Sequence, residues 1–232
     1  AFYRWDWLGG DWAVPFQPPE LWANFTVTTH GQAVSQQLPV LARSLDQGIG
    51  EIRRPVQIVP RISIRLSPDR LLWPMAASHT HTFKVSLEHL ARDTTSAEVS
   101  LQVPSGWRVD PPKRVTLRGE GVRVAADFLV TAPTTVLNGN YEIKTLVVAG
   151  NDTIKEGVYR IDYPHVEPRN LVSVAGATVV MANVALPRSS QIGYLRGAAD
   201  RIPEALLNSG VKLRVLSGLE AQGAVLDSLR TL

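Results

Sequence analysis

Apolar and polar residues alternate along most of residues 24–164, with a period of two that is typical of strands burying one face. Turn-forming residues, such as Pro104-Ser105-Gly106 and Asn138-Gly139-Asn140, separate these runs, and no long helical period interrupts them. The pattern predicts strands at residues 24–29, 56–59, 62–66, 81–88, 97–103, 114–117, 122–130, 141–148 and 157–163. Residues 35–47 fit a helix, a strand or a loop, with strand and loop favoured.

Many short strands with turns between them are typical of an antiparallel sandwich, so we expect an immunoglobulin-like β-sandwich domain at residues 60–164. Val99, Leu101 and Val103 point to one face of a strand, and the Pro104 to Gly106 turn then reverses the chain. Trp107 follows the turn at the start of another strand, where a large ring can close one end of the core. We therefore expect Trp107 to be a core residue rather than a ligand platform.

The pattern changes in the last part of the chain, residues 165–232, where a linker leads to an α/β unit. Residues 171–175 and 178–184 are strand-like, and residues 191–195 and 211–216 predict two further strands. Between this last pair, residues 202–208 predict a helix with Pro203 in its first turn and Gly210 beyond its end. The fold expected for the whole chain is thus mainly β, with an antiparallel sandwich followed by an incomplete βαβ unit.

Two parallel strands do not make a stable sheet, because a parallel sheet needs cover on both faces. We therefore expect residues 165–232 to begin a truncated doubly wound domain of a larger protein. Residues 186–232 should pack on the sandwich and linker strands of the same chain, with self-association as the second alternative.

Residues 1–59 form an aromatic-rich N-terminal segment that also contains strands. Trp5, Trp7, Trp12 and Trp22 lie close together in the sequence, among glycines and prolines that break regular elements. The favoured interpretation is that these rings pack against a neighbouring domain. The alternative is an aromatic surface that stacks on a glycan.

Composition excludes several classes of function. The net charge is only +3 and no Lys/Arg-rich run occurs, so no nucleic-acid partner is expected. No run approaches the ~20 apolar residues of a membrane span. The chain has no cysteine, which excludes disulfides, thiolate metal sites and cysteine nucleophiles. The sequence does not fix the cellular compartment, and the expectation is a periplasmic or secreted location.

The sequence contains no recognisable catalytic or metal-binding motif, and neither kind of residue is predicted. His79 and His81 share one face of a strand and could reach one metal, but a solvated strand start is favoured. His89 is expected to be solvated near a strand end, and His165 to make a hydrogen bond in the linker.

Arg196 and Asp200 are the only candidate ligand-binding residues, because their turn follows the first strand of an α/β unit, where such folds bind ligands. The favoured alternative is that Asp200 caps the helix.

Three stretches resemble one family of carbohydrate-active proteins. GEIRRPVQIVP (50–60) resembles the beginning of the accessory region of large bacterial LmbE-like (PIG-L-type) de-N-acetylases. The region from VPSGW (103–107) to Tyr141 resembles the NPCBM-associated β-sandwich module. YPHV (163–166) with IGYLRGAADRIPEAL (192–206) resembles the start of the glutamine-amidotransferase-like domain of those proteins.

The resemblance implies a parent enzyme that removes an acetyl group from an N-acetylated sugar with a divalent metal. The catalytic signature of that family is a His-Pro-x-Asp cluster, and no histidine here precedes a proline. No catalytic or metal residue is therefore carried over, and zinc is expected only in a catalytic domain outside this chain.

Three functions remain in competition. The favoured one is a non-catalytic accessory region that docks other domains of the parent protein or contacts a glycan weakly. The second is a stand-alone carbohydrate-binding or adhesive β-sandwich. The third is a self-contained hydrolase, which would need polar groups clustered in one pocket. For this chain alone we expect no enzymatic activity.

Overall fold

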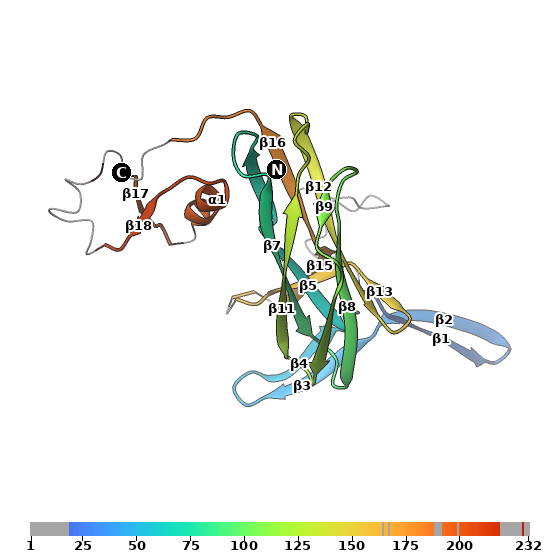
Figure 1. The fold of residues 1–232 in the computed structure, drawn as a ribbon. Coiled ribbons are helices and arrows are strands. Elements are labelled where there is room, and N and C mark those ends of the chain that lie inside the picture. Colours follow the sequence, from blue (N-terminus) through green and yellow to red (C-terminus); the bar gives the residue numbers. More distant parts are fainter. Residues whose placement is uncertain are drawn as a thin grey trace. The chain divides into compact units, whose positions relative to one another are not determined.

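The structure is a computed structural model that describes residues 19–163, 165–166, 168–187, 192–198, 200–218 and 229. The chain divides into two compact units, Ala1–Val59 and Pro60–Leu232, which are described one at a time (Figure 1). Among the described residues, no helix reaches the length and hydropathy that a membrane-crossing helix requires.

The first unit contains two antiparallel hairpins. β1 (Trp22–Thr29) pairs with β2 (Gln32–Pro39), and β3 (Leu41–Asp46) pairs with β4 (Gly50–Pro55). His30 and Gly31 join the first pair with positive φ angles of 51° and 78°, as a two-residue hairpin turn requires. None of residues 19–59 is buried, so the described part of this unit has no core of its own.

The strand predicted at residues 56–59 is wrong, because these residues form an extended connection. Pro55 and Pro60 flank it and lack the N–H groups that a ladder needs. Isolated bonds form instead, from the Val56 N–H to the Val40 carbonyl and from the Ile58 N–H to the Glu20 carboxylate. Residues 35–47, which were ambiguous, belong largely to β2 and β3.

The second unit is built on two sheets that face each other (Figure 1). The first sheet has the order β10 (Lys113–Arg118), β8 (Thr94–Gln102), β12 (Gly139–Ala149), β16 (Gly176–Ala182) and β6 (Arg70–Pro74), with β13 (Asp152–Ile154) paired to β12. The second has the order β5 (Ile62–Ser67), β7 (Thr80–His89), β11 (Arg123–Thr131) and β9 (Arg108–Val109). All these pairs are antiparallel except β16 with β6.

The core lies between the two sheets and takes alternate residues from each strand. Phe83 and Val85 of β7 and Phe128 of β11 come from one sheet, and Val99 and Ile143 come from the other; all five are fully buried. The predicted immunoglobulin-like antiparallel sandwich is thereby confirmed.

Trp107 is 8% exposed, as the sequence analysis expected of a core residue. Its ring packs edge-on against Trp73, with centroids 5.5 Å apart, and lies 5.4 Å from the ring of Tyr141.

One strand of the sandwich comes from residues that the sequence analysis placed in the linker. β16 lies between β12 and the edge strand β6 of the larger sheet, and its Val179 is fully buried. The strand character of this segment was visible in the sequence, but its pairing with residues far earlier in the chain was not. Before it, β14 (Glu156–Ile161) and β15 (Arg169–Val174) form a separate antiparallel hairpin.

The last described part is the predicted βαβ unit. β17 (Gly193–Leu195) pairs in parallel with β18 (Arg214–Leu216), and α1 (Ile202–Asn208) connects them, as expected. Gly210, with φ +92°, follows the helix. The Asn208 carbonyl at the helix end lies 3.0 Å from Nε2 of His81 on β7, which is a contact within the same chain of the kind expected for this part.

Candidate functional site

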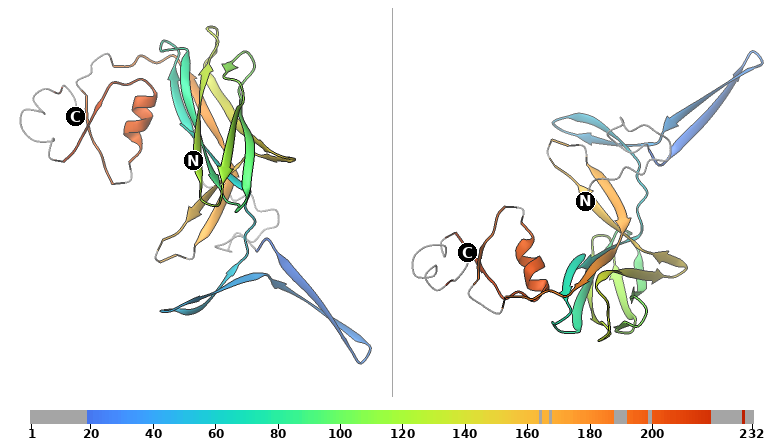
Figure 2. Two further views of the ribbon diagram at one scale, coloured as in Figure 1. Left: turned by 60° about the horizontal axis from the view of Figure 1, so that its bottom comes forward. Right: turned by 90° about the horizontal axis from the view of Figure 1, so that it is seen from above.

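A groove of about 350 Å³ lies along β5, the edge strand of the smaller sheet. The hairpin β14–β15, drawn in yellow and orange in Figure 2, leaves the sandwich and forms the opposite side of the groove. Asp69, residues 175–176 and Arg201 complete the lining. Ligand sites in proteins have volumes of roughly 300–1,000 Å³, so the groove has room for a small ligand or one or two sugar rings.

Ser63 on β5 holds the hairpin through hydrogen bonds, and Gly157 on β14 allows the two strands to come close together. The Val158 N–H donates to Oγ of Ser63 over 2.8 Å, and this hydroxyl lies 3.4 Å from the Val158 carbonyl, to which it can donate. Next to them, a Cβ atom added to Gly157 would lie 2.1 Å from the Ile64 carbonyl oxygen. The two backbones therefore approach so closely that only glycine fits at position 157.

Polar side chains of different kinds line this groove. They are Arg65 on β5, Asp69, Tyr159 on β14, and Arg201 just before α1. Among the described residues, none of these four side chains has a hydrogen-bond, ion-pair or ring-contact partner. Arginine donates only, an ionised aspartate accepts only, and a tyrosine offers a hydroxyl and an apolar ring face. Together they can hold hydroxyl or carboxylate groups on a ring that packs on Tyr159.

Sequence reasoning missed this groove, because its lining comes from four segments that are distant in the sequence. One weak signal was present: Arg65 is an exposed polar residue between Ile64 and Leu66, and Tyr159 is an exposed aromatic residue that follows Val158 on β14. Such residues are common on solvated faces, and nothing local shows that two of them share a groove.

The structure places the predicted candidates Arg196 and Asp200 together, in a cluster with Tyr194 and Glu204. The Asp200 carboxylate accepts a hydrogen bond from the Tyr194 hydroxyl and another, over 2.8 Å, from the Ile202 N–H. The Arg196 guanidinium donates to the Glu204 carboxylate. Both candidates therefore already have partners within the chain. Arg201 is the N-cap residue of α1, yet the Asp200 carboxylate still binds an N–H of the first helical turn.

The same contacts shift the pKa values of these exposed groups. The hydrogen bond from Tyr194, followed by that from the Ile202 N–H, lowers the pKa of Asp200, and the bond to Asp200 raises the pKa of Tyr194. The bond from Arg196 lowers the pKa of Glu204 and raises that of Arg196. Each bond thus favours an ionised carboxylate and a protonated donor. At neutral pH the carboxylates are therefore charged, and the tyrosine and arginine keep their protons.

A carboxyl titration followed by NMR should show Asp200 ionising below its ordinary range, and Tyr194→Phe should move its pKa back upward. Because the pKa is lowered in the folded state, the stabilisation is present above the pKa of the unfolded chain and is lost as the pH falls through the folded value. Asp46 is an internal control, since the N–H groups of Gly48 and Ile49 lower its pKa without Tyr194. An Asp200 titration that Tyr194→Phe leaves unchanged would contradict the assignment.

The aromatic candidates are described only in part. Trp5, Trp7 and Trp12 lie outside the described residues, whereas Trp22 lies on β1 and is 43% exposed. A glycan-stacking role for these four residues stays a prediction.

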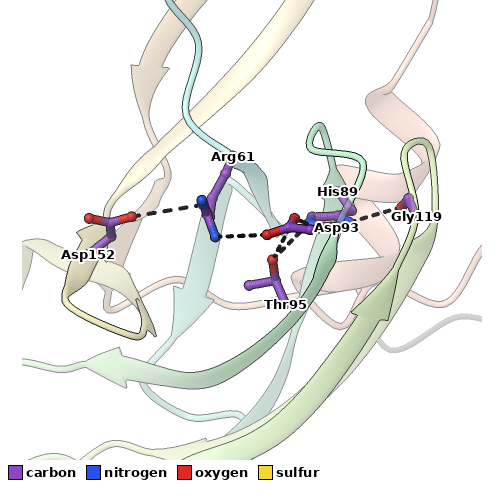
Figure 3. A network of polar contacts seen from close by, with 6 residues as sticks. All are labelled: Arg61, His89, Asp93, Thr95, Gly119 and Asp152. Carbon is purple, nitrogen blue, oxygen red and sulfur yellow. Dashed lines mark hydrogen bonds and ion pairs between the residues drawn. The ribbon is translucent and has the colours of Figure 1, made fainter.

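His89, expected to be solvated, is instead fully buried and sits at the centre of a polar network (Figure 3). Its Nδ1 lies 2.9 Å from the Gly119 carbonyl oxygen and its Nε2 lies 2.9 Å from Oγ1 of Thr95. The Asp93 carboxylate approaches both Nε2, at 3.6 Å, and Arg61, at 3.4 Å. The network ties together the loops at one end of the sandwich. Because His89 and Thr95 are both buried, no substrate can reach them, and the network is structural.

A signal for this burial was present in the sequence. The alternation of β7 places His89 in phase with Phe83, Val85 and Leu87, all of which face the core. Its position at the strand end led to the wrong expectation.

The remaining histidines make ring contacts or face solvent. His81 is half-buried between the rings of Trp73 and Phe83, at 5.6 and 5.4 Å, whereas His79 is exposed. The ring of His165 stacks on Tyr163 at 6.0 Å. Within the part of the chain that the structure describes, no three histidine, aspartate or glutamate side chains are grouped so that they could hold a metal.

Comparison with protein families identifies a known domain within the second unit. Residues 77–149 match the NPCBM-associated, NEW3 domain of alpha-galactosidase. The matched segment runs from just before β7 to the end of β12 and so contains strands of both sheets. No curated protein matches the sequence.

Three solved structures show low similarity to the chain, with identities of 8–16% and TM-scores of 0.33–0.34. The cupredoxin domain of amoB from Nitrosocaldus yellowstonii is 16% identical, with 53% of this chain and 88% of that chain covered and a TM-score of 0.33. A FixG-related protein from Vibrio parahaemolyticus is 8% identical, with 50% and 98% covered and a TM-score of 0.34. Alpha-2-macroglobulin from Escherichia coli is 16% identical, with 54% and 17% covered and a TM-score of 0.34.

Proposed function

We propose that this chain is a non-catalytic accessory region of a carbohydrate-active protein, in which the β-sandwich contacts a glycan through the groove beside β5. The match of residues 77–149 to the NEW3 domain of alpha-galactosidase is the observation that carries the proposal. The groove supports it, because Arg65, Asp69, Tyr159 and Arg201 bring donors, acceptors and a ring face to one surface, and their side chains have no partner in the part of the chain that the structure describes.

The proposed parent protein is an LmbE-like de-N-acetylase, on the resemblance of residues 50–60 and 192–206 to that family. In such a protein this region would also dock other domains, which are its proposed partners, and zinc would belong to the catalytic domain. The βαβ unit supports the docking role, because its Leu195, Ile202 and Leu207 are about half exposed. Such apolar side chains are expected on a surface that another domain covers.

Titration of the 232-residue chain with a panel of oligosaccharides, followed by calorimetry and NMR, tests the proposal. The panel contains N-acetylated sugars, their deacetylated forms, galactosides and uronic acids. A small groove should give weak binding, with a Kd of about 0.1–1 mM, and no acetate should be released. The heat-unfolded chain is the control. If the folded chain binds no member of the panel, the proposed glycan contact is wrong.

A further inference from the structure

The groove beside β5 carries a charge pattern that distinguishes between classes of glycan. Three charged side chains line it, Arg65, Arg201 and Asp69, which gives two positive charges against one negative charge. The two cations enter from different parts of the chain, one on β5 and one at the start of α1. The groove is therefore positive overall.

Both arginines are available to an incoming anion. Elsewhere on the second unit, arginines such as Arg92, Arg123 and Arg160 pair with a carboxylate of the chain at 2.8–3.3 Å. Arg65 and Arg201 have no such partner among the described residues, and Asp69 pairs with neither of them. A guanidinium binds a carboxylate through two parallel N–H bonds, and bonds between charged groups are stronger than those to a neutral hydroxyl.

The rest of the lining suits a sugar ring more than a bare anion. Tyr159 is 49% exposed and presents its ring from β14, whereas Ser67 and Ser173 offer hydroxyl groups on either side. Asp69 can accept from sugar hydroxyls while the arginines hold an anionic group. Ile64 and Leu66 of β5, whose side chains belong to the sandwich core, also contribute atoms to the lining.

We infer that the groove binds a carboxylate-bearing glycan of the uronic-acid type, with Arg65 and Arg201 holding the carboxylate, Tyr159 packing on the ring and Asp69 accepting from hydroxyls. This inference rests on the proposed function and adds the class of sugar to it.

The test compares two probes that differ only in the charged group, methyl glucuronide and methyl glucoside. Both are titrated into the 232-residue chain and followed by backbone NMR shifts. The glucuronide should bind at least about tenfold more tightly, with shifts at β5, β14 and Arg201. Its affinity should fall as salt is raised, whereas that of the glucoside should not, because the Debye length shrinks from about 10 Å at 0.1 M to about 3 Å at 1 M.

Variants identify the residues responsible. Arg65→Gln and Arg201→Gln should each remove most of the preference for the glucuronide while the weak binding of the glucoside is kept. Tyr159→Ala should weaken the binding of both probes. The matched control is Arg118→Gln, because Arg118 is an exposed arginine of β10 outside the groove. Since all these side chains are exposed, unfolding midpoints equal to that of the wild type will show that the fold is kept.

The outcomes separate this inference from the proposed function. Equal binding of both probes, or a glucuronide preference that survives both arginine substitutions, overturns the inference and leaves the glycan contact standing. Shifts that map away from the groove also overturn it. If neither probe nor any member of the oligosaccharide panel binds, the proposed function fails together with the inference.

Discussion

Trp107→Ala is expected to lower the free energy of unfolding of the sandwich by about 3–5 kcal/mol, the usual cost of removing a large buried ring. The side chain is 8% exposed and fills the space between the rings of Trp73 and Tyr141. The indole of Trp73 is itself held by a 2.7 Å hydrogen bond to the Ser78 carbonyl, so it cannot move freely into the cavity. Little of the loss should therefore be recovered by repacking.

Chemical denaturation followed by circular dichroism measures this loss. Trp22→Ala is the matched control, because it makes the same change at a ring that is 43% exposed on β1. It should change the free energy of unfolding by no more than about 0.5 kcal/mol. A denaturation midpoint for Trp107→Ala close to that of the wild type would show that the ring does not support the core.

The strands of the sandwich were predictable from sequence wherever one face is buried. In β7 and β8 the apolar residues alternate strictly, whereas β11 and β12 also contain continuous apolar runs. The predicted bounds of all four strands agree with the structure to within a few residues. β13 was missed because its three residues are too few to establish a period, and β6 because the adjacent Leu71 and Leu72 hide the alternation. The segment 56–59 shows the opposite error, since its apolar character predicts a strand, whereas the structure gives it an extended connection between Pro55 and Pro60.

The pairing between strands that are distant in the sequence could not be predicted from the sequence alone. Local pattern indicates that β16 is a strand, but its place between β12 and β6 depends on contacts with residues 70–74 and 139–144. For the same reason, the sequence could not show that β14 and β15 form a hairpin beside β5.

The candidate site was less predictable than the fold. Arg196 and Asp200 were nominated from their place after a strand, and the structure shows that local contacts with Glu204 and Tyr194 already engage them. Arg65 and Arg201, whose side chains have no partner among the described residues, stand far apart in the sequence and resemble ordinary solvated side chains. The groove forms because the backbone contact between β5 and β14 holds the hairpin beside β5.

That contact gives the second large effect: Gly157→Ala should detach the hairpin β14–β15 from β5. The new Cβ would lie 2.1 Å from the Ile64 carbonyl oxygen and 3.3 Å from its carbon. Both atoms belong to the backbone of a strand paired with β7, so neither can rotate away. The hairpin must therefore shift, which breaks the bonds between Val158 and Ser63. Overpacking of this kind costs about 1–3 kcal/mol or more.

Hydrogen exchange at the Val158 amide reports this detachment directly, because its N–H is bound to Ser63 only while the hairpin is docked. Exchange should become much faster in Gly157→Ala, whereas amides of β7 and β11 in the core should keep most of their protection. Gly218→Ala is the matched control, since its Cβ would have open space and its φ is ordinary. Ser63→Ala separates the two causes, as it removes the hydrogen bonds without a clash and should accelerate the same amide less. If the Val158 amide of Gly157→Ala exchanged as slowly as in the wild type, the hairpin would not be docked on β5. The groove, one side of which is formed by the hairpin, would then not exist as described.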